Sequence, residues 1–258
     1  MREWSTMAES ARSTVQSVAR AFEILEIMST GSDDMGISHI AEQTSLPLPT
    51  IHRILRTLVV GGYVYQTPGR RYALGARLIP LSRNAGGSLG ASLRPRLVDI
   101  VKQTHESVSV TMIDRDHGRY IAHVPSEQSM RMFAQVGNQI DLHATGAGKA
   151  ILSMMPDAEI RTLLQRTGMH AITSRTIIDL ETMMIEIEHV RRRGYALDVE
   201  EHELGVSCVA VPIHGPLGLA MSISGPQPRM TQRTVDQAVP ILVSAADEIS
   251  RELSQKGA

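Results

Sequence analysis

The sequence predicts an α+β fold in two parts, a small helical domain followed by a larger domain of mixed strands and helices. Apolar residues recur at helical spacing through about the first 60 residues, and two short strand-like segments follow them. After about residue 85, segments with strand alternation and segments with helical spacing both occur. The length of 258 residues is enough for one large domain or two ordinary ones, each with a core.

The composition is that of a globular protein, with 42% hydrophobic and 21% charged residues. With two Phe and one Trp, the core must be built from aliphatic side chains and the fourteen Met. The one cysteine, Cys208, excludes an internal disulfide and fits a reducing compartment. No apolar run reaches the roughly 18 residues of a membrane helix, and the N-terminus lacks the apolar region of a signal peptide. We therefore expect a cytoplasmic protein.

Positive charge is concentrated toward the N-terminus. Residues 1–83 contain nine Arg and seven acids, a net charge of 9 − 7 = +2, whereas the remainder contains 26 − 9 = 17 basic and 27 − 7 = 20 acidic residues, a net charge of −3. Between Gln43 and Val98 there is no Asp or Glu, but there are eight arginines: Arg53, Arg56, Arg70, Arg71, Arg77, Arg83, Arg94 and Arg96. Such a patch indicates a local anionic partner, although a solvated arginine-rich face gives the same pattern.

The first three predicted helices are short and amphipathic. They cover residues 18–28, 37–44 and roughly 49–60, and Gly61 and Gly62 end the third. Residues 63–66 (YVYQ) and 71–74 (RYAL) predict two strands around a turn. Because the residue before a proline avoids the helical region, we expect Leu46 and Leu48 to be extended and Pro49 to lie in the first turn of the third helix.

Three helices followed by a hairpin are the plan of a winged helix-turn-helix, whose last helix enters the major groove of DNA. We predict this domain for residues 14–76, with the helix-turn-helix at about 37–60. The polar face of the third helix and the hairpin tip supply the candidate DNA contacts, which are Thr50, His52, Arg53, Arg56, Thr57, Arg70 and Arg71. The missing acids then have a reason, since a carboxylate there would repel phosphate. The alternative is a small helical domain with a basic face.

The second part predicts an antiparallel sheet with helices on its faces. Strands are expected at residues 108–113, 119–124, 131–136, 195–200, 207–213 and 219–224. Helices are expected from Thr145 to about residue 155, at 157–165 with Asp157 as the cap, at 180–193, and after Thr231.

Polar or small residues interrupt three of the predicted strands: Asp198, Cys208, Ser222 and Ser224. The two serines share a face because side chains alternate along a strand. A carboxylate in an apolar stretch needs partners. A strand cysteine alone is more often a small buried hydrophobe, and two serines can lie on an exposed sheet surface. Together the residues favour a small-molecule pocket.

No catalytic, metal or cofactor motif stands out. The GAGK segment at residues 146–149 lacks the spacing of a phosphate loop, although the N–H groups of a helix start can hold a carboxylate. The run EEHE at residues 200–203 could bind a metal with His143 or His214, but it lacks ligand-type spacing. We predict no catalytic residue, no metal and no cofactor.

Several segments, in order along almost the whole chain, resemble the IclR family of bacterial transcriptional regulators. They are ISHIAEQTSLPLPTIHRILRTLVVGGYVYQ, RYALG, LHATGAGKAILS, GYALDVEEHELGVSCVAVPI and SISGP. The family signature falls on Gly194, Asp198, Glu201 and Cys208. Two places depart from the family pattern: Leu48 and Pro49 replace a frequent lysine and serine, and the signature ends on His214 and Gly215.

The resemblance implies a linker helix and a GAF-like effector-binding domain over residues 77–258. It implies effector contact at Asp198, Cys208, Ser222, Ser224 and the backbone of Gly146 and Ala147. It further implies a homodimer or homotetramer that binds a palindromic operator, is controlled by a small organic acid or hydroxy acid, and represses nearby catabolic genes. The competing interpretation is a metabolic enzyme or sensor whose winged helix binds a protein. The acid-free arginine stretch favours the regulator.

Overall fold

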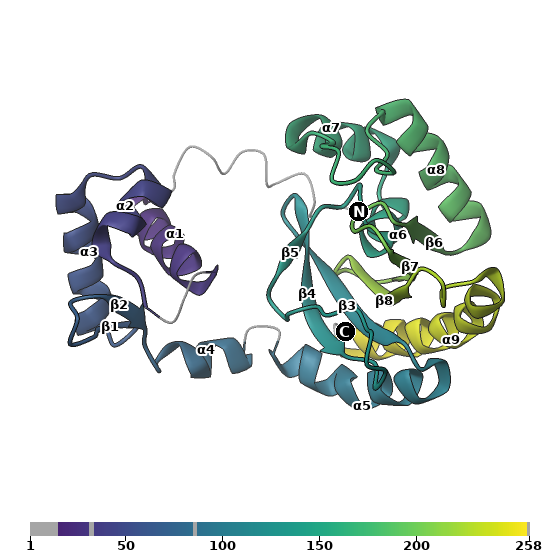
Figure 1. Ribbon diagram of the computed structural model, residues 1–258, viewed down its shortest axis with the longest axis horizontal. Helices are drawn as coiled ribbons and strands as arrows, with labels where there is room; N and C mark the ends of the chain where they lie inside the picture. The colour runs from purple at the N-terminus through teal and green to yellow at the C-terminus, as the bar shows by residue number, and fades with distance from the viewer. Residues whose placement is uncertain (1–14, 31–33, 85–86, 257–258) are drawn as a thin grey trace. The chain divides into compact units, whose positions relative to one another are not determined.

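The computed structural model describes residues 15–30, 34–84 and 87–256 (Figure 1). The chain divides into two compact units, residues 1–85 and 86–258. The sequence places the domain boundary slightly earlier, at residues 76–77, ahead of helix α4 (Leu78–Asn84). No helix within the described ranges is long and apolar enough to cross a membrane.

The first unit is built as the sequence predicts. Helices α1 (Gln16–Thr30), α2 (Ile37–Thr44) and α3 (Leu48–Val60) precede an antiparallel hairpin of β1 (Val64–Gln66) and β2 (Tyr72–Leu74). Their apolar faces meet in one core that includes Ile24, Ile40, Ile51, Leu55 and Val64. A backbone bridge between Met35 and Tyr72 ties the segment before α2 to the hairpin. This is the arrangement of a winged helix-turn-helix.

The start of α3 differs from the expected one. Pro47 is the extended N-cap, and the helix begins at Leu48, so the prediction that Leu48 stays outside it is wrong. Pro49 occupies the second helical position, where the missing N–H would have no intrahelical partner. The steric bias against a helical residue before proline is a preference, and the helix overrides it at this one position.

The second unit is a six-stranded antiparallel sheet between two layers of helices. Its strands are β3 (Ser107–Asp114), β4 (His117–Val124), β5 (Gln139–Ile140), β6 (Ala196–Val199), β7 (Val206–Ile213) and β8 (Leu219–Pro226), in the order β5-β4-β3-β8-β7-β6. Helices α5 (Gly87–Thr104) and α9 (Gln232–Lys256) cover one face. Helices α6 (Gly146–Ser153), α7 (Asp157–Thr167) and α8 (Leu180–Arg193) cover the other.

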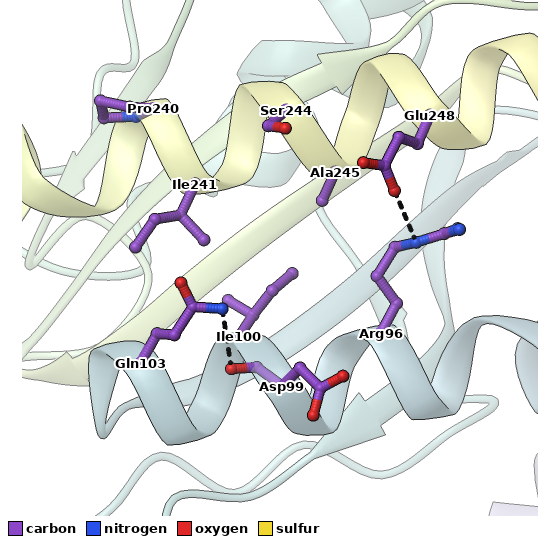
Figure 2. A pocket seen from close by; sticks show the side chains of 9 residues that line it. All are labelled: Arg96, Asp99, Ile100, Gln103, Pro240, Ile241, Ser244, Ala245 and Glu248. Atoms are coloured by element: carbon purple, nitrogen blue, oxygen red, sulfur yellow. Dashed lines mark hydrogen bonds and ion pairs between the residues drawn. The ribbon is translucent and has the colours of Figure 1, made fainter.

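Alternation along the central strands divides the core in two. On β7, Val209 and Val211 pack toward α5 and α9, whereas Cys208 and Ala210 pack toward α6. Figure 2 shows α5 and α9 side by side, with Arg96 paired to Glu248 across them. The groove between the two helices has a volume of about 410 Å³, and Arg96 Nε lies 3.3 Å from Glu248 Oε2. The α5–α9 face is almost wholly apolar where it meets the sheet, so polar chemistry inside this unit lies on the α6 face.

Two expectations for this unit are wrong. Residues 131–136 form no strand, because the edge of β4 pairs instead with Gln139 and Ile140. Asp157 is the first residue of α7 and not its cap, since Pro156 holds the cap position. The other expected helices and strands are present, and Thr231 accepts the Thr234 N–H ahead of α9 as a cap does.

Candidate functional site

Helix α3 presents a polar face to solvent. Its apolar side chains at Ile51, Ile54, Leu55 and Leu58 are buried, so helical spacing leaves the remaining positions outward. The outward side chains include His52, Arg53, Arg56 and Thr57, which are exposed, and Thr50, which is half-buried. Within the described part of the chain, neither Arg53 nor Arg56 has a side-chain hydrogen bond or ion pair. Both guanidinium groups are therefore available to phosphates and base edges.

The hairpin tip contains two arginines with different surroundings. Arg70 is exposed in the left-handed region at φ 58°, and its backbone closes the turn with Thr67. Arg71 is engaged, since its Nε lies 2.5 Å from Asp34 Oδ1 and its Nη2 donates to the Asp34 carbonyl at 2.8 Å. Arg71 thus braces the hairpin against the segment before α2. A contact of Arg71 with DNA stays a prediction that nothing in its geometry requires.

Three further arginines of the acid-free stretch have partners inside their own unit. Arg77 donates to the Gly61 carbonyl, Arg94 donates to the His123 carbonyl, and Arg96 pairs with two glutamates of α9. The acid-free stretch is therefore not free of acidic partners in the fold. Asp34 and two glutamates of α9, which lie outside the stretch in sequence, pair with its arginines. Among the residues that the structure describes, the basic surface that remains free on the first unit centres on α3 and Arg70 and is narrower than the sequence suggests.

The predicted effector residues come together on the α6 face of the sheet. Asp198 pairs across the strands with Cys208, Cys208 with Ser224, and Ala210 with Ser222. Residues paired in this way project from the same face. Gly146 lies above this row, since a side-chain Cβ at that position would come within 3.1 Å of Cys208 Sγ. A larger residue there would push against Cys208, so glycine lets the start of α6 lie close to the sheet.

The start of α6 supplies backbone donors. Thr145 is the N-cap, and its hydroxyl accepts the Gly148 N–H at 3.1 Å. The N–H groups of Gly146 and Ala147 lie in the first turn, where a helix offers them no carbonyl partner. Such N–H groups bind anions, and the helix dipole adds to the attraction. The arrangement suits a small carboxylate held between α6 and the strands.

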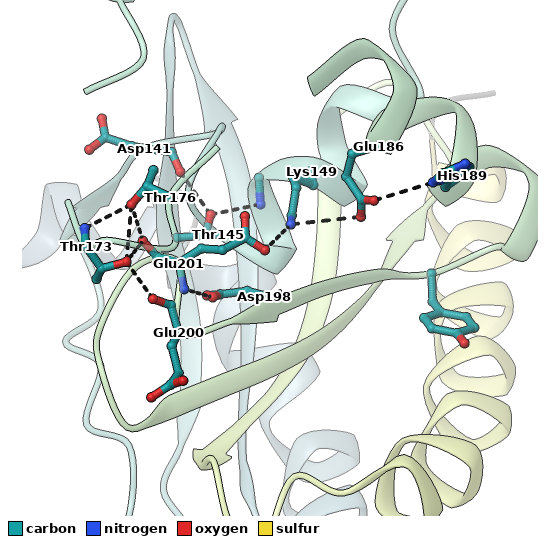
Figure 3. Close-up of polar contacts among 12 residues, drawn as sticks. Asp141, Thr145, Lys149, Thr173, Thr176, Glu186, His189, Asp198, Glu200 and Glu201 are labelled. Carbon is teal, nitrogen blue, oxygen red and sulfur yellow. Dashed lines mark hydrogen bonds and ion pairs between the residues drawn. The ribbon is translucent and has the colours of Figure 1, made fainter. Parts of the chain in front are cut away.

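A buried ionic cluster, absent from the sequence-based site, lies beside this row (Figure 3). Lys149 is 1% exposed, and its Nζ lies 2.5 Å from Glu201 Oε1 and 3.9 Å from Glu186 Oε1. Asp198 Oδ1 accepts the Glu201 N–H at 2.8 Å. The cluster thus joins α6 to β6, which carries Asp198, and to the β6–β7 connection, which carries Glu201. The sequence singles out Lys149 only within an incomplete phosphate loop, because nothing local reveals its partner 52 residues away.

Burial favours the neutral form of both ionisable groups of the row. Burial raises the pKa of Asp198 from 3.8 to about 7, against the hydrogen bond from Glu201 that lowers it. Burial raises the pKa of Cys208 to about 12, so the thiol stays protonated and is a poor nucleophile. In the described residues, no group of three or more His, Cys, Asp or Glu side chains is placed to hold a metal ion.

The Asp198 pKa predicts a pH dependence of stability. Because the folded-state pKa is above the unfolded value, the folded state retains a proton between about pH 4 and pH 7 that the unfolded chain releases. The free energy of unfolding should therefore fall as pH rises through this window. Asp198→Asn should remove this component, on the order of 1–3 kcal/mol, in urea unfolding at pH 5 to 8. The exposed Asp247→Asn is the control. Equal pH slopes in wild type and Asp198→Asn would contradict the prediction.

Family comparisons agree with both units. The model for the IclR helix-turn-helix domain matches residues 17–68, and the model for the bacterial transcriptional regulator IclR C-terminal domain matches residues 87–251. The acetate operon repressor of Salmonella typhimurium is 34% identical over 244 residues, covering 92% of this chain and 89% of that protein.

Solved structures give the same result. An IclR transcriptional regulator from Alicyclobacillus acidocaldarius has a TM-score of 0.84 at 29% identity, covering 93% of this chain and 99% of that one. An IclR homologue from Microbacterium hydrocarbonoxydans, complexed with 4-hydroxybenzoate, shares the fold with a TM-score of 0.80 at 21% identity, covering 93% and 99%. The matches span both units, and the proteins from Salmonella typhimurium and Alicyclobacillus acidocaldarius are named as a repressor and a transcriptional regulator. The chain belongs to the IclR family of bacterial transcriptional regulators.

Proposed function

We propose that the chain represses a nearby catabolic operon by binding a palindromic operator, and that a small organic acid releases or rearranges it. The main support for this proposal is that one chain contains both a candidate DNA-binding surface and a candidate effector site. Helix α3 holds Arg53 and Arg56 exposed and without a partner among the described residues, and a separate unit holds a buried polar row beneath the start of α6. Since its target is bacterial DNA, the protein acts in the cytoplasm.

The acid class of the effector follows from the donors. The α6 N–H groups and the hydroxyls of Ser222 and Ser224 favour a carboxylate. Asp198 weakens this preference for a carboxylate, because its pKa is about 7 and its ionised form would repel an anion. The IclR homologue complexed with 4-hydroxybenzoate agrees with an acid.

We propose that two copies of the first unit associate on DNA. A groove of about 880 Å³ lies between α1, α3 and α4, and apolar side chains line much of it, including Val18, Phe22, Leu25, Leu78 and Leu81. Phe22 is 60% exposed, which is unusual for a residue that does not contact a partner. Two-fold pairing of the unit would match two half-sites of a palindrome. Sedimentation should give the mass of a dimer or tetramer, and a monomer at operator-binding concentrations would contradict the proposal.

A salt titration tests DNA binding directly. Affinity of the full chain for duplex from upstream of its own gene should fall steeply as salt rises, with a log–log slope of roughly −0.9 per phosphate neutralised. Affinity that stays flat or undetectable from low salt upward would contradict operator binding.

Release by an acid is tested at fixed salt. The acid must bind the two arrangements of the protein unequally, otherwise it could not change operator occupancy. An acid that raises the melting temperature should therefore also change operator affinity. An acid that stabilises the chain strongly and leaves operator affinity unchanged would contradict the regulatory link.

A further inference from the structure

The polar row on the α6 face extends past the predicted effector residues onto β3 and β4. Ser109 pairs with Ser222 of β8, and Thr111 pairs with Ala220, so both project toward the α6 layer. On the other side, His123 of β4 pairs with Ser109, and the His123 Nδ1 lies 3.0 Å from Ser109 Oγ. A polar strip therefore runs from β6 to β4, across neighbouring strands of one sheet face.

Two atoms of this extension are buried without a hydrogen-bond partner in the described residues. Thr111 is 0% exposed, and its Oγ1 is unpaired. The Nε2 atom of His123 is likewise buried and unpaired, whereas its Nδ1 is used by Ser109. Buried polar atoms normally have a partner, because an unpaired one loses its hydrogen bonds to water without replacement. Two such atoms in one strip can each hydrogen-bond a buried water or a polar group of a bound molecule.

The neighbouring chain packs around the strip, and Tyr120, which pairs with Thr111, lies on the same face of the sheet. The Thr111 methyl packs on Gly118, where a Cβ would come within 2.8 Å of Thr111 Cγ2. The segment that follows β4 packs on the end of the strip: Ser107 donates to the Met132 carbonyl, and the Phe133 ring lies edge-on to His123 at 6.4 Å between centroids. These contacts use Ser107 and the ring of His123, and they leave the two unpaired atoms without partners.

The chemistry of the strip is neutral. Burial lowers the pKa of His123, and the nearby Arg94 lowers it further, so the imidazole is uncharged near pH 7. A neutral imidazole nitrogen and a threonine hydroxyl can donate to or accept from a hydroxyl, but they provide no charge for a second carboxylate. A carboxylate is instead favoured next to the N–H groups at the start of α6 and the hydroxyl of Ser222.

We propose that Thr111, Ser109 and His123 form a second subsite of the effector pocket, which binds a hydroxyl group of the effector. This rests on the proposed function, since it takes the carboxylate to lie at α6 and β8. Strands lie about 4.8 Å apart, so β8 and β4 are separated by about 10 Å, and the hydroxyl and carboxylate are several bonds apart. The effector class is a hydroxy acid with its hydroxyl distant from the carboxylate.

The test compares acids that differ by one hydroxyl: butanoate with 4-hydroxybutanoate, and benzoate with 4-hydroxybenzoate. Calorimetric titration of the full-length wild type should show at least one hydroxylated acid binding about tenfold tighter than its partner or better. Thr111→Val keeps the shape and removes the hydroxyl, so it should lose most of this preference while binding the hydroxyl-free acid within about threefold of wild type. Thr111→Ser should retain the preference. Thr162→Val, on the exposed face of α7, is the matched control.

If Thr111→Val fails to fold, Ser109→Ala serves as the second variant, since it removes the hydrogen bond that fixes His123. In either variant, the hydroxylated acid and its hydroxyl-free counterpart should bind with more similar affinities than they do to the wild type. A full hydroxyl preference in both variants, or no preference in the wild type for any pair, would overturn the subsite. Operator binding measured on the same preparations separates this result from failure of the proposed function, which predicts DNA binding whatever the acid.

Discussion

Replacing Arg53 and Arg56 together by alanine is expected to weaken binding to upstream duplex DNA by at least about 30-fold near physiological salt. Both side chains are exposed on α3, and neither has a partner among the described residues. Each loss should remove one phosphate or base-edge contact, costing about 1–3 kcal/mol for a base contact. If both arginines touch phosphate, the log–log salt slope should become less steep by about 2. Fluorescence anisotropy over a salt series measures both quantities.

Controls separate this effect from loss of charge or fold. Arg192→Ala with Arg233→Ala removes the same charge from exposed positions of the second unit and should change affinity little. Arg71→Ala should weaken DNA binding by loosening the hairpin from Asp34, with little change in salt slope. The Arg53 and Arg56 variant should keep the melting temperature and acid-induced stabilisation of wild type. Wild-type DNA affinity in this variant would show that α3 does not bind DNA.

Local pattern predicted most elements because local physics decides them. Helix α8 runs over the predicted residues, since Asp179 caps its start and Gly194, at φ 81°, ends it. The segment 131–136 has the alternation of a strand but pairs with none, and the start of the β4 edge pairs with β5 instead. Which segment takes an edge depends on competition between distant parts of the chain, and alternation alone does not encode it.

The same limit applies to the sites. The absence of acids from the arginine stretch predicted a basic surface, but Asp34 lies before the stretch and Glu248 after it, and each binds one of its arginines. On the sheet, the family resemblance selected Asp198, Cys208 and the two serines. It gave no sign of Thr111 or His123, since their place in the row follows from β3 lying between β4 and β8. Strand order across a sheet is a long-range property.

Lys149→Met is expected to produce the largest loss of stability, about 3–5 kcal/mol. Methionine fills a similar space, but the Glu201 carboxylate then lies buried without the cation 2.5 Å away. Its Oε2 atom already lacks a partner among the described residues, so little remains to compensate. For a unit of this size the melting temperature should drop by roughly 6–15 °C. Thermal unfolding followed by circular dichroism measures the drop, and Lys102→Met, on an exposed part of α5, is the control.

The cause can be isolated with the partner variant. If the loss comes from an unpaired buried charge, Glu201→Gln added to Lys149→Met should restore much of the stability, since the double variant has neither charge. Lowering the pH should also restore stability to the Lys149→Met variant, because it neutralises the same carboxylate. Burial already raises the pKa of Glu201, and removing Lys149 raises it further, so the carboxyl takes up a proton as pH falls and the deficit shrinks from pH 7.5 to pH 5. A deficit independent of pH and not relieved by Glu201→Gln would instead show that the lost stability does not come from an unpaired Glu201 carboxylate.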